Sequence, residues 1–145
     1  MDVHNKETRS YNMSHIRAGK TKPDEIVAKY LFSAGFRYRR NVKKLPGTPD
    51  IVLKKYKTVI FVNGCFWHMH EGCKYFVWPQ DNAEFWRKKL FANKERDERE
   101  QIELARLGWN VIVVWECELK KDKREATLQN LMATLRENRN ESNKL

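Results

Sequence analysis

One short segment of the sequence concentrates residue types that bind transition metals. Two cysteines and two histidines fall within nine residues: Cys65, His68, His70 and Cys73. Structural zinc takes four sulfur and imidazole ligands in a tetrahedron, so the two cysteines and one histidine supply three ligands, and Cys117 can supply the fourth. The spacing does not decide between His68 and His70. The competing interpretation is a pair of buried, reduced cysteines near surface histidines.

A second group of residues could bind a hard metal ion. Asp50 follows Pro49 in a turn, at the start of an expected strand. A carboxylate held there beside a phosphate could bind Mg²⁺, although a Pro-Asp pair in a turn is more often structural. Glu25 is equally ambiguous between a functional and a structural role. The structural interpretation is that an acidic residue in the first turn of a helix interacts favourably with the helix dipole.

Aromatic side chains lie in and after the metal-binding segment. Phe66 and Trp67 lie inside it, and Phe85 and Trp86 lie near the start of the next expected helix. Aromatic residues in a loop beside a basic surface can insert between DNA bases. For Trp86, core packing is the usual alternative, whereas adjacent Phe66 and Trp67 are seldom both buried in one loop.

The surrounding elements must position these residues. The hydrophobic and turn patterns predict a helix from Thr21 to Gly35, strands over residues 36–42, 51–53, 58–62 and 109–115, a long helix from Asp81 to Gly108 and a final helix over residues 122–137. Capping boxes are expected at the start of the first two helices, from Thr21 and from Asp81. The strands over residues 58–62 and 109–115 are apolar enough to be buried. This order of elements predicts an α/β domain with a mixed central β-sheet flanked by helices.

Length and composition narrow the class of protein. The 145 residues suit one domain, and we expect an N-terminal DNA-contacting arm over residues 1–20, a folded domain over 21–138 and a flexible tail over 139–145. The net charge of +10 favours a polyanionic partner. Residues 1–44 hold 11 basic and 4 acidic side chains, so this region is expected to face phosphates.

The cysteine count and the hydropathy pattern indicate the cellular compartment in which the protein is expected. Three cysteines cannot form a closed set of disulfides. The sequence shows no signal peptide, and its apolar runs are far below the roughly 20 residues of a membrane span. A soluble, cytoplasmic protein with no membrane partner is expected.

Several motifs in order resemble the very-short-patch-repair (Vsr-type) DNA mismatch endonuclease family. The likeness runs from Asp2 to about Leu119. Its strongest motifs are Thr8-Arg9-Ser10-x-Asn12-Met13, Leu45-Pro46-Gly47-x-Pro49-Asp50, Gly64-Cys65-Phe66-Trp67-His68, Glu84-Phe85-Trp86, Leu107-Gly108-Trp109 and Val114-Trp115-Glu116-Cys117.

The resemblance implies a restriction-endonuclease-like fold with a structural zinc site. It implies Mg²⁺-dependent nicking of one strand on the 5′ side of the thymine in a T:G mismatch, the lesion left when 5-methylcytosine deaminates. The partner would be double-stranded DNA carrying that mismatch. Mismatch-repair proteins and a companion cytosine methyltransferase are candidate partners, and a monomer associated with the bacterial nucleoid is expected.

The resemblance also assigns roles to individual residues. Asp50 is similar to the metal-binding carboxylate, with the backbone carbonyl of Val62 as a further magnesium ligand. His68 is similar to the histidine that activates water, and Glu25 to a supporting acid. The zinc ligands would be Cys65, His70, Cys73 and Cys117. The DNA-inserting residues would be Phe66, Trp67 and Trp86 on one side and Met13 from the other groove.

One departure affects the catalytic assignment. The best-known members have Thr-His where this chain has Val62-Asn63. A ligand provided by the backbone survives the change to Val62, and Asn63 can still hydrogen-bond a phosphate but does not titrate. Two alternatives stay open: a nicking endonuclease of a restriction–modification system that acts in another sequence context, and a zinc-stabilised DNA-binding protein without catalysis.

Overall fold

The computed structural model describes residues 22–143, with side chains described through residue 139. The expected arm over residues 1–20, including Met13, and the first capping residue, Thr21, therefore lie outside the described part. No helix within the described residues is both long and apolar enough to cross a membrane.

A four-stranded mixed sheet forms the centre of the molecule, in the order β1-β2-β3-β4. The strands are β1 (Arg39–Arg40), β2 (Ile51–Leu53), β3 (Thr58–Asn63) and β4 (Asn110–Trp115). The first three are antiparallel, and a 3₁₀ turn (η1, Lys54–Tyr56) connects β2 to β3. β4 lies parallel to β3, with Thr58 opposite Asn110 and Asn63 opposite Trp115. The mixed α/β class predicted from the sequence is confirmed.

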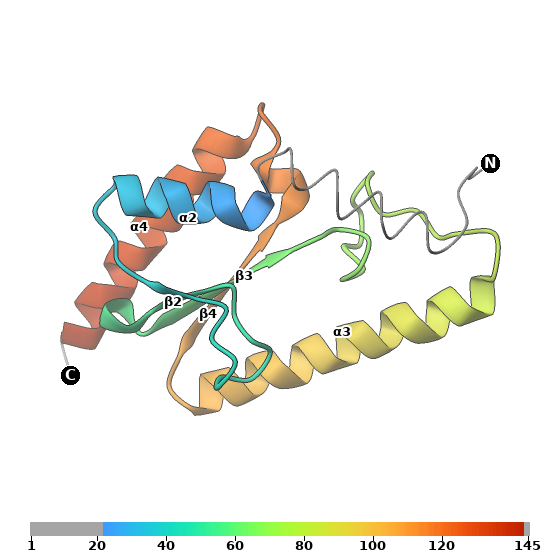
Figure 1. Cartoon of the computed structure of the whole chain (residues 1–145), viewed down its shortest axis with the longest axis horizontal. Helices are drawn as coiled ribbons and strands as arrows, with labels where there is room; N and C mark the ends of the chain where they lie inside the picture. The colour runs from blue at the N-terminus through green and yellow to red at the C-terminus, as the bar shows by residue number, and fades with distance from the viewer. Residues whose placement is uncertain (1–21, 144–145) are drawn as a thin grey trace.

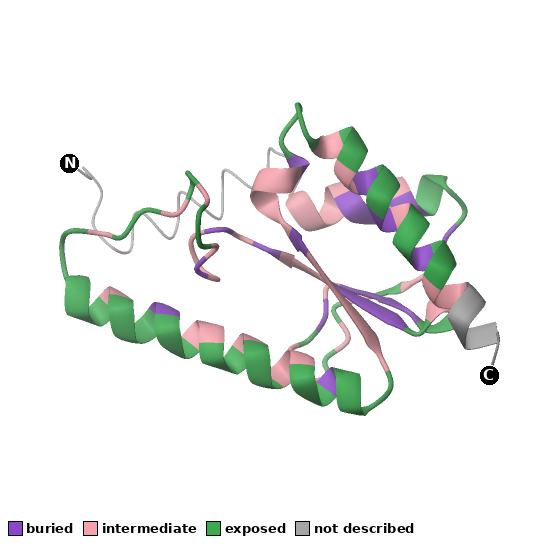
Figure 2. Ribbon diagram, turned by 180° about the vertical axis from the view of Figure 1, so that it is seen from behind, coloured by how far each residue is buried: buried purple, intermediate pink, exposed green. Residues whose placement is uncertain are grey.

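Helices cover both faces of the sheet (Figure 1). α2 (Pro23–Ser33) and α4 (Arg124–Asn143) lie together on one face, and α3 (Ala83–Arg106) lies on the other. Successive strand residues point to opposite faces: Ile60 joins the core formed with α2 and α4, whereas Val59 packs with Leu104 of α3. Figure 2 shows that α3 is largely exposed, with some intermediate positions and only isolated buried ones along its length.

Several element boundaries differ from the sequence prediction. The strand expected over residues 36–42 pairs only at Arg39–Arg40, because Asn41 adopts a positive φ of 51° that ends the extended run. Neither α2 nor α3 has a side-chain cap, since the residues that precede them, Lys22 and Asn82, make no capping hydrogen bond. α2 does end before Gly35, whose φ of 95° suits glycine.

Two further differences concern the C-terminal third of the chain. α4 continues to Asn143, beyond the predicted end at residue 137. β4 was expected to be buried, but Val114 is its one buried residue. The strand order explains this result, because β4 is the last strand of the sheet and has a neighbour on one side only. A short 3₁₀ turn, η2 (Glu116–Leu119), follows β4.

Candidate active site and metal centre

The sheet opens at one end of β3, and Asp50 lies in that opening. β3 pairs with β4 along its full length but with β2 only as far as Ile60. The β2 side of β3 is therefore available beyond Ile60, and the N–H of Val62 donates a hydrogen bond of 2.7 Å to Oδ2 of Asp50. This bond fixes the carboxylate directly before β2.

A cavity of about 410 Å³ occupies this opening. Residues from four parts of the chain line it, including Gly47, Asp50, Val62, Asn63, His68, Arg96, Asp97 and Glu100. The turn before Asp50 approaches the cavity wall closely. A Cβ on Gly47 would lie 3.1 Å from side-chain atoms of Phe61 and Glu100, so a larger residue there would displace the wall.

The environment of Asp50 changes its acidity. Burial raises the pKa of its carboxyl above the ordinary value, and the nearby Asp24 carboxylate adds to this increase. The N–H of Val62 and the charges of Arg40 and His68 lower the same pKa and partly offset the effect of burial. Arg40 connects these groups, because it forms an ion pair of 2.7 Å with Asp24 and donates to the Asp50 carbonyl at 3.3 Å.

His68 is oriented by an acidic residue that sequence reasoning missed. Nδ1 of His68 lies 2.6 Å from Oδ2 of Asp97 on α3. This contact favours the tautomer with the proton on Nδ1, which leaves Nε2 free to accept a proton. The sequence did contain a signal. In the highly charged α3, the uncharged residues Leu90, Asn93 and Leu104 recur at helical spacing and so lie on one face of the helix, and Asp97 falls on the same face.

Not every predicted catalytic residue lies at the cavity. Asp50, Val62, Asn63 and His68 all line it. Glu25 lies half-buried in the first turn of α2 and is not among the lining residues. Its neighbour Asp24 is the residue of that turn that interacts with Asp50 and Arg40. The structure thus brings the N-terminus of α2 close to the cavity without placing Glu25 in it.

The second site lies beyond the ends of the two parallel strands. Asn63 and Trp115 are opposite each other in the register of β3 and β4. Cys65 and Cys117 each follow two residues later, so the parallel register brings both thiols to the same edge of the sheet. Cys73 and His70 reach them through the turn that follows Cys65.

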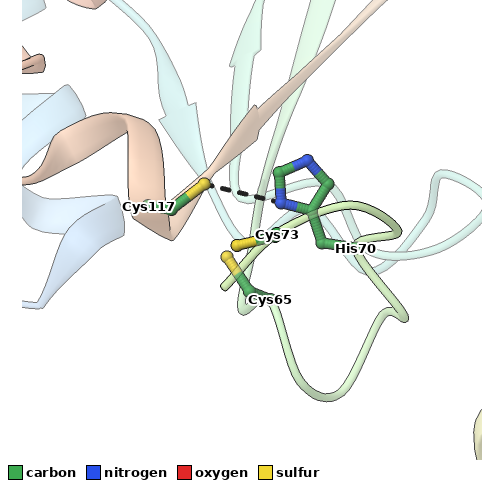
Figure 3. A group of neighbouring side chains, drawn as sticks. All are labelled: Cys65, His70, Cys73 and Cys117. Carbon is green, nitrogen blue, oxygen red and sulfur yellow. Dashed lines mark hydrogen bonds between the residues drawn. The ribbon is translucent and has the colours of Figure 1, made fainter. Parts of the chain in front are cut away.

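These four side chains point toward one another (Figure 3). Their ligand atoms all lie within 4.8 Å of one another, and Sγ of Cys117 is 3.5 Å from Nδ1 of His70. In a tetrahedral zinc site a sulfur and a nitrogen ligand are about 3.5 Å apart, so the spacing fits zinc. The geometry also separates the two histidines, because His70 joins the cysteines whereas His68 faces the cavity.

The surroundings of the cluster fit a metal site. All three cysteines are free, and Cys65 is buried. Burial raises the pKa of the Cys65 thiol to about 12; a bound metal ion would favour the thiolate instead. The ring of Trp115 stacks on His70 with centroids 4.0 Å apart, which holds the imidazole plane in place.

The three aromatic residues expected to insert into DNA form one cluster, and its Trp67 directly precedes the cavity residue His68. Phe66 lies 5.2 Å from Trp67 and 5.4 Å from Trp86, and the two tryptophans are 5.8 Å apart. All three are half-buried rather than enclosed in the core. The side-chain amide of Asn93 donates to the carbonyl of Trp67 at 3.1 Å. α3 therefore contacts both Trp67 and its neighbour His68.

A family model described as "DNA mismatch endonuclease Vsr" matches residues 1–74, slightly more than half of the chain. The DNA mismatch endonuclease Vsr of Escherichia coli is 44% identical over 119 residues, which cover 82% of this chain and 76% of that protein. The chain belongs to the Vsr family. It is a DNA endonuclease, and the resemblance of the motifs is confirmed.

Other relatives of this Vsr family member are named as nicking enzymes. The type II nicking enzyme V.NmeAIP of Neisseria meningitidis is 50% identical over 119 residues, covering 82% of this chain and 84% of the relative. V.XorIIP of Xanthomonas oryzae, also named a type II nicking enzyme, is 44% identical over 127 residues, covering 87% and 93%. These similarities support a nicking endonuclease that acts on DNA.

Proposed function

We propose that this Vsr family member nicks one strand of duplex DNA on the 5′ side of the thymine in T:G mismatches, by Mg²⁺-dependent hydrolysis of the phosphodiester. The observation that carries the proposal is that Asp50 and His68 line one cavity, and that His68 directly follows Trp67 of the Phe66–Trp67–Trp86 cluster. The carboxylate that would bind the metal thus shares a cavity with the imidazole that would accept the proton, and the rings that would separate the bases begin one residue away. A restriction-endonuclease-like arrangement of the mixed sheet is part of this proposal.

Asp50 and the backbone carbonyl of Val62 would hold the magnesium ion. In an extended strand the N–H and C=O of one residue point to the same side. The N–H of Val62 points to Asp50, so its carbonyl is directed toward the same opening. When bound, Mg²⁺ would polarise the phosphate and stabilise the leaving oxygen.

His68 would take the proton from the attacking water. The contact with the Asp97 carboxylate favours a proton on Nδ1 of the ring, so Nε2 would be the atom that accepts. The imidazolium that forms is stabilised by the same carboxylate. Asn63, buried at the cavity wall, would donate a hydrogen bond to a phosphate oxygen. Glu25 would act as a supporting acid from α2.

The three clustered aromatic residues would select the mismatch. Phe66, Trp67 and Trp86 would insert beside the T:G pair, and Met13 would approach from the other groove. A mismatched step costs less to unstack than a matched one. Insertion of the aromatic side chains would therefore favour mismatched sites before the phosphodiester is cut.

Zinc bound by Cys65, His70, Cys73 and Cys117 would have a structural role. The four ligands leave no open position for substrate. The ion would fix the segment that carries both Phe66–Trp67 and His68. This proposal has its own readout, the metal content of the purified protein.

The test of the proposed function is a nicking assay with Mg²⁺ on a labelled T:G duplex and on its matched T:A and C:G counterparts. We expect one nick in the thymine strand of the T:G duplex and none when Asp50→Ala replaces the wild type. Equal cutting of matched DNA would refute mismatch specificity. Salt-dependent binding with no nick at any Mg²⁺ concentration would instead favour a DNA-binding protein without catalysis.

A second candidate function differs in sequence context. Two relatives are named type II nicking enzymes, and the second proposal is that this chain serves a restriction–modification system and nicks T:G mismatches in the sequence context of that system. A panel of T:G duplexes with different flanking pairs separates the two, because each predicts a different preferred context. A companion cytosine methyltransferase would share that context.

A further inference from the structure

A second group of large apolar side chains lies exposed outside the Phe66–Trp67–Trp86 cluster. We call Tyr75, Val77, Trp78 and Phe91 the outer aromatic surface. Their exposed fractions are 47%, 72%, 37% and 48%. Half of the eight large exposed apolar residues in the described part of the chain belong to this one region. Such a concentration is typical of a binding surface.

The outer aromatic surface is continuous with the inserting cluster. Phe66 lies 6.2 Å from Phe76, Phe76 lies 5.0 Å from Trp78, and Trp78 lies 5.8 Å from Phe91. These ring contacts form an unbroken path from Phe66, one of the residues proposed to insert into DNA, to Phe91 in the first half of α3. Nucleotides displaced at the insertion point could therefore continue along this path.

Cations accompany the exposed rings. The guanidinium of Arg87 lies 6.0 Å from the ring of Trp78, and the ammonium groups of Lys74 and Lys120 lie 5.2 and 5.0 Å from Tyr75. Residues 74–91 hold four basic and two acidic side chains. Exposed rings interleaved with Lys and Arg are the combination by which proteins bind single-stranded nucleic acid, since bases stack on the rings and phosphates face the cations.

We propose that the outer aromatic surface binds unpaired nucleotides of the nicked strand, so that the enzyme holds the strand end it has released. Stacking needs bases that are out of the duplex, and nicking beside an inserted aromatic cluster supplies them. The positive charge disfavours a basic protein partner. The proposal rests on the nicking function proposed above and extends it to the product.

Binding without catalysis tests this inference. In buffer without added Mg²⁺, we expect the wild-type protein to bind a nicked T:G duplex that carries a short thymidine 5′ flap about tenfold more tightly than the same nicked duplex without a flap. Trp78→Ala should remove this preference and leave the affinity for the duplex without a flap unchanged. Fluorescence anisotropy with labelled DNA measures both.

Phe32→Ala is the matched control, because Phe32 is 55% exposed and also carries an arginine over its ring, Arg37 at 4.0 Å. It should keep the flap preference. Arg87→Gln provides a second variant that retains the ring packing, and it should reduce the preference and its salt dependence. No flap preference in the wild type, or an unchanged preference in Trp78→Ala, would overturn the inference. Because this assay requires no nick, its result is separate from failure of the proposed nicking function.

Discussion

The contact between His68 and Asp97 yields the sharpest prediction about catalysis. The side chains are 26% and 18% exposed, and the joined atoms are 2.6 Å apart, so the hydrogen bond is largely shielded from water. A charge-assisted hydrogen bond of this kind is worth about 1.5–3 kcal/mol. Asp97→Asn removes the charge that stabilises the imidazolium and permits the wrong tautomer, so the nicking step should slow roughly 10- to 150-fold.

The assay is single-turnover nicking of a T:G duplex at saturating enzyme with Mg²⁺, with DNA affinity measured separately. Affinity should stay unchanged in Asp97→Asn. Glu95→Gln on the exposed side of the same helix is the control, and it should nick at the wild-type rate. His68→Ala should cost about 10²- to 10⁴-fold, and the double variant should be no slower than His68→Ala. A wild-type rate for Asp97→Asn, or losses that multiply in the double variant, would refute the reasoning.

Three further predictions concern the carboxylate, the metal centre and the aromatic cluster. Burial raises the folded-state pKa of the Asp50 carboxyl above its unfolded value. The ionised carboxylate therefore destabilises the folded state at neutral pH, and this destabilisation disappears as the pH falls through the folded-state pKa and the carboxyl becomes protonated. Asp50→Asn should therefore raise the melting temperature at pH 7, by an amount that shrinks toward acid pH, while abolishing nicking. Metal analysis should find about one zinc per chain, and Cys117→Ser should lower both zinc content and thermal stability; full zinc retention would contradict the ligand assignment. Trp86→Ala should reduce the preference for T:G over matched DNA about tenfold in competition binding, whereas an unchanged preference would indicate a packing role alone.

Much of the fold follows from local sequence patterns. The apolar runs over residues 51–53 and 58–62 form strands where predicted, and the long helix ends at Arg106, before Gly108. The failures occur where tertiary contacts decide. In the segment after α2, the N–H of Asn41 donates to the carbonyl of Asp50 and that of Val42 to the carbonyl of Pro49. The chain stays beside the Asp50 turn without forming a regular strand, which alternation of residue types cannot reveal.

The candidate site was predictable to the extent that its residues lie close in sequence. The cysteines and histidines after β3 could be grouped by spacing, but the choice of His70 over His68 depends on the turn between them. Asp97 lies 29 residues from His68, on a highly charged helix, and only its helical spacing from Leu90 and Asn93 separates it from the solvated charges. Its role depends on the angle at which α3 crosses the sheet, and Leu104 sets part of that placement by packing against Val59.

The segment after β3 has little apolar burial of its own, and this explains why it needs other attachments. Of residues 64–80, Cys65 and Met69 are buried, which is too small a core to order so long a loop. The cysteine–histidine cluster ties it to the end of β4, and Asn93 and Asp97 tie Trp67 and His68 to α3. Cys117→Ser, which removes one proposed zinc ligand, should therefore weaken mismatch preference and nicking together, because both depend on the order of one loop. Asp97→Asn should reduce nicking alone, which is also the pattern expected for loss of a purely catalytic metal. A joint loss of mismatch preference and nicking in Cys117→Ser would therefore indicate a structural metal.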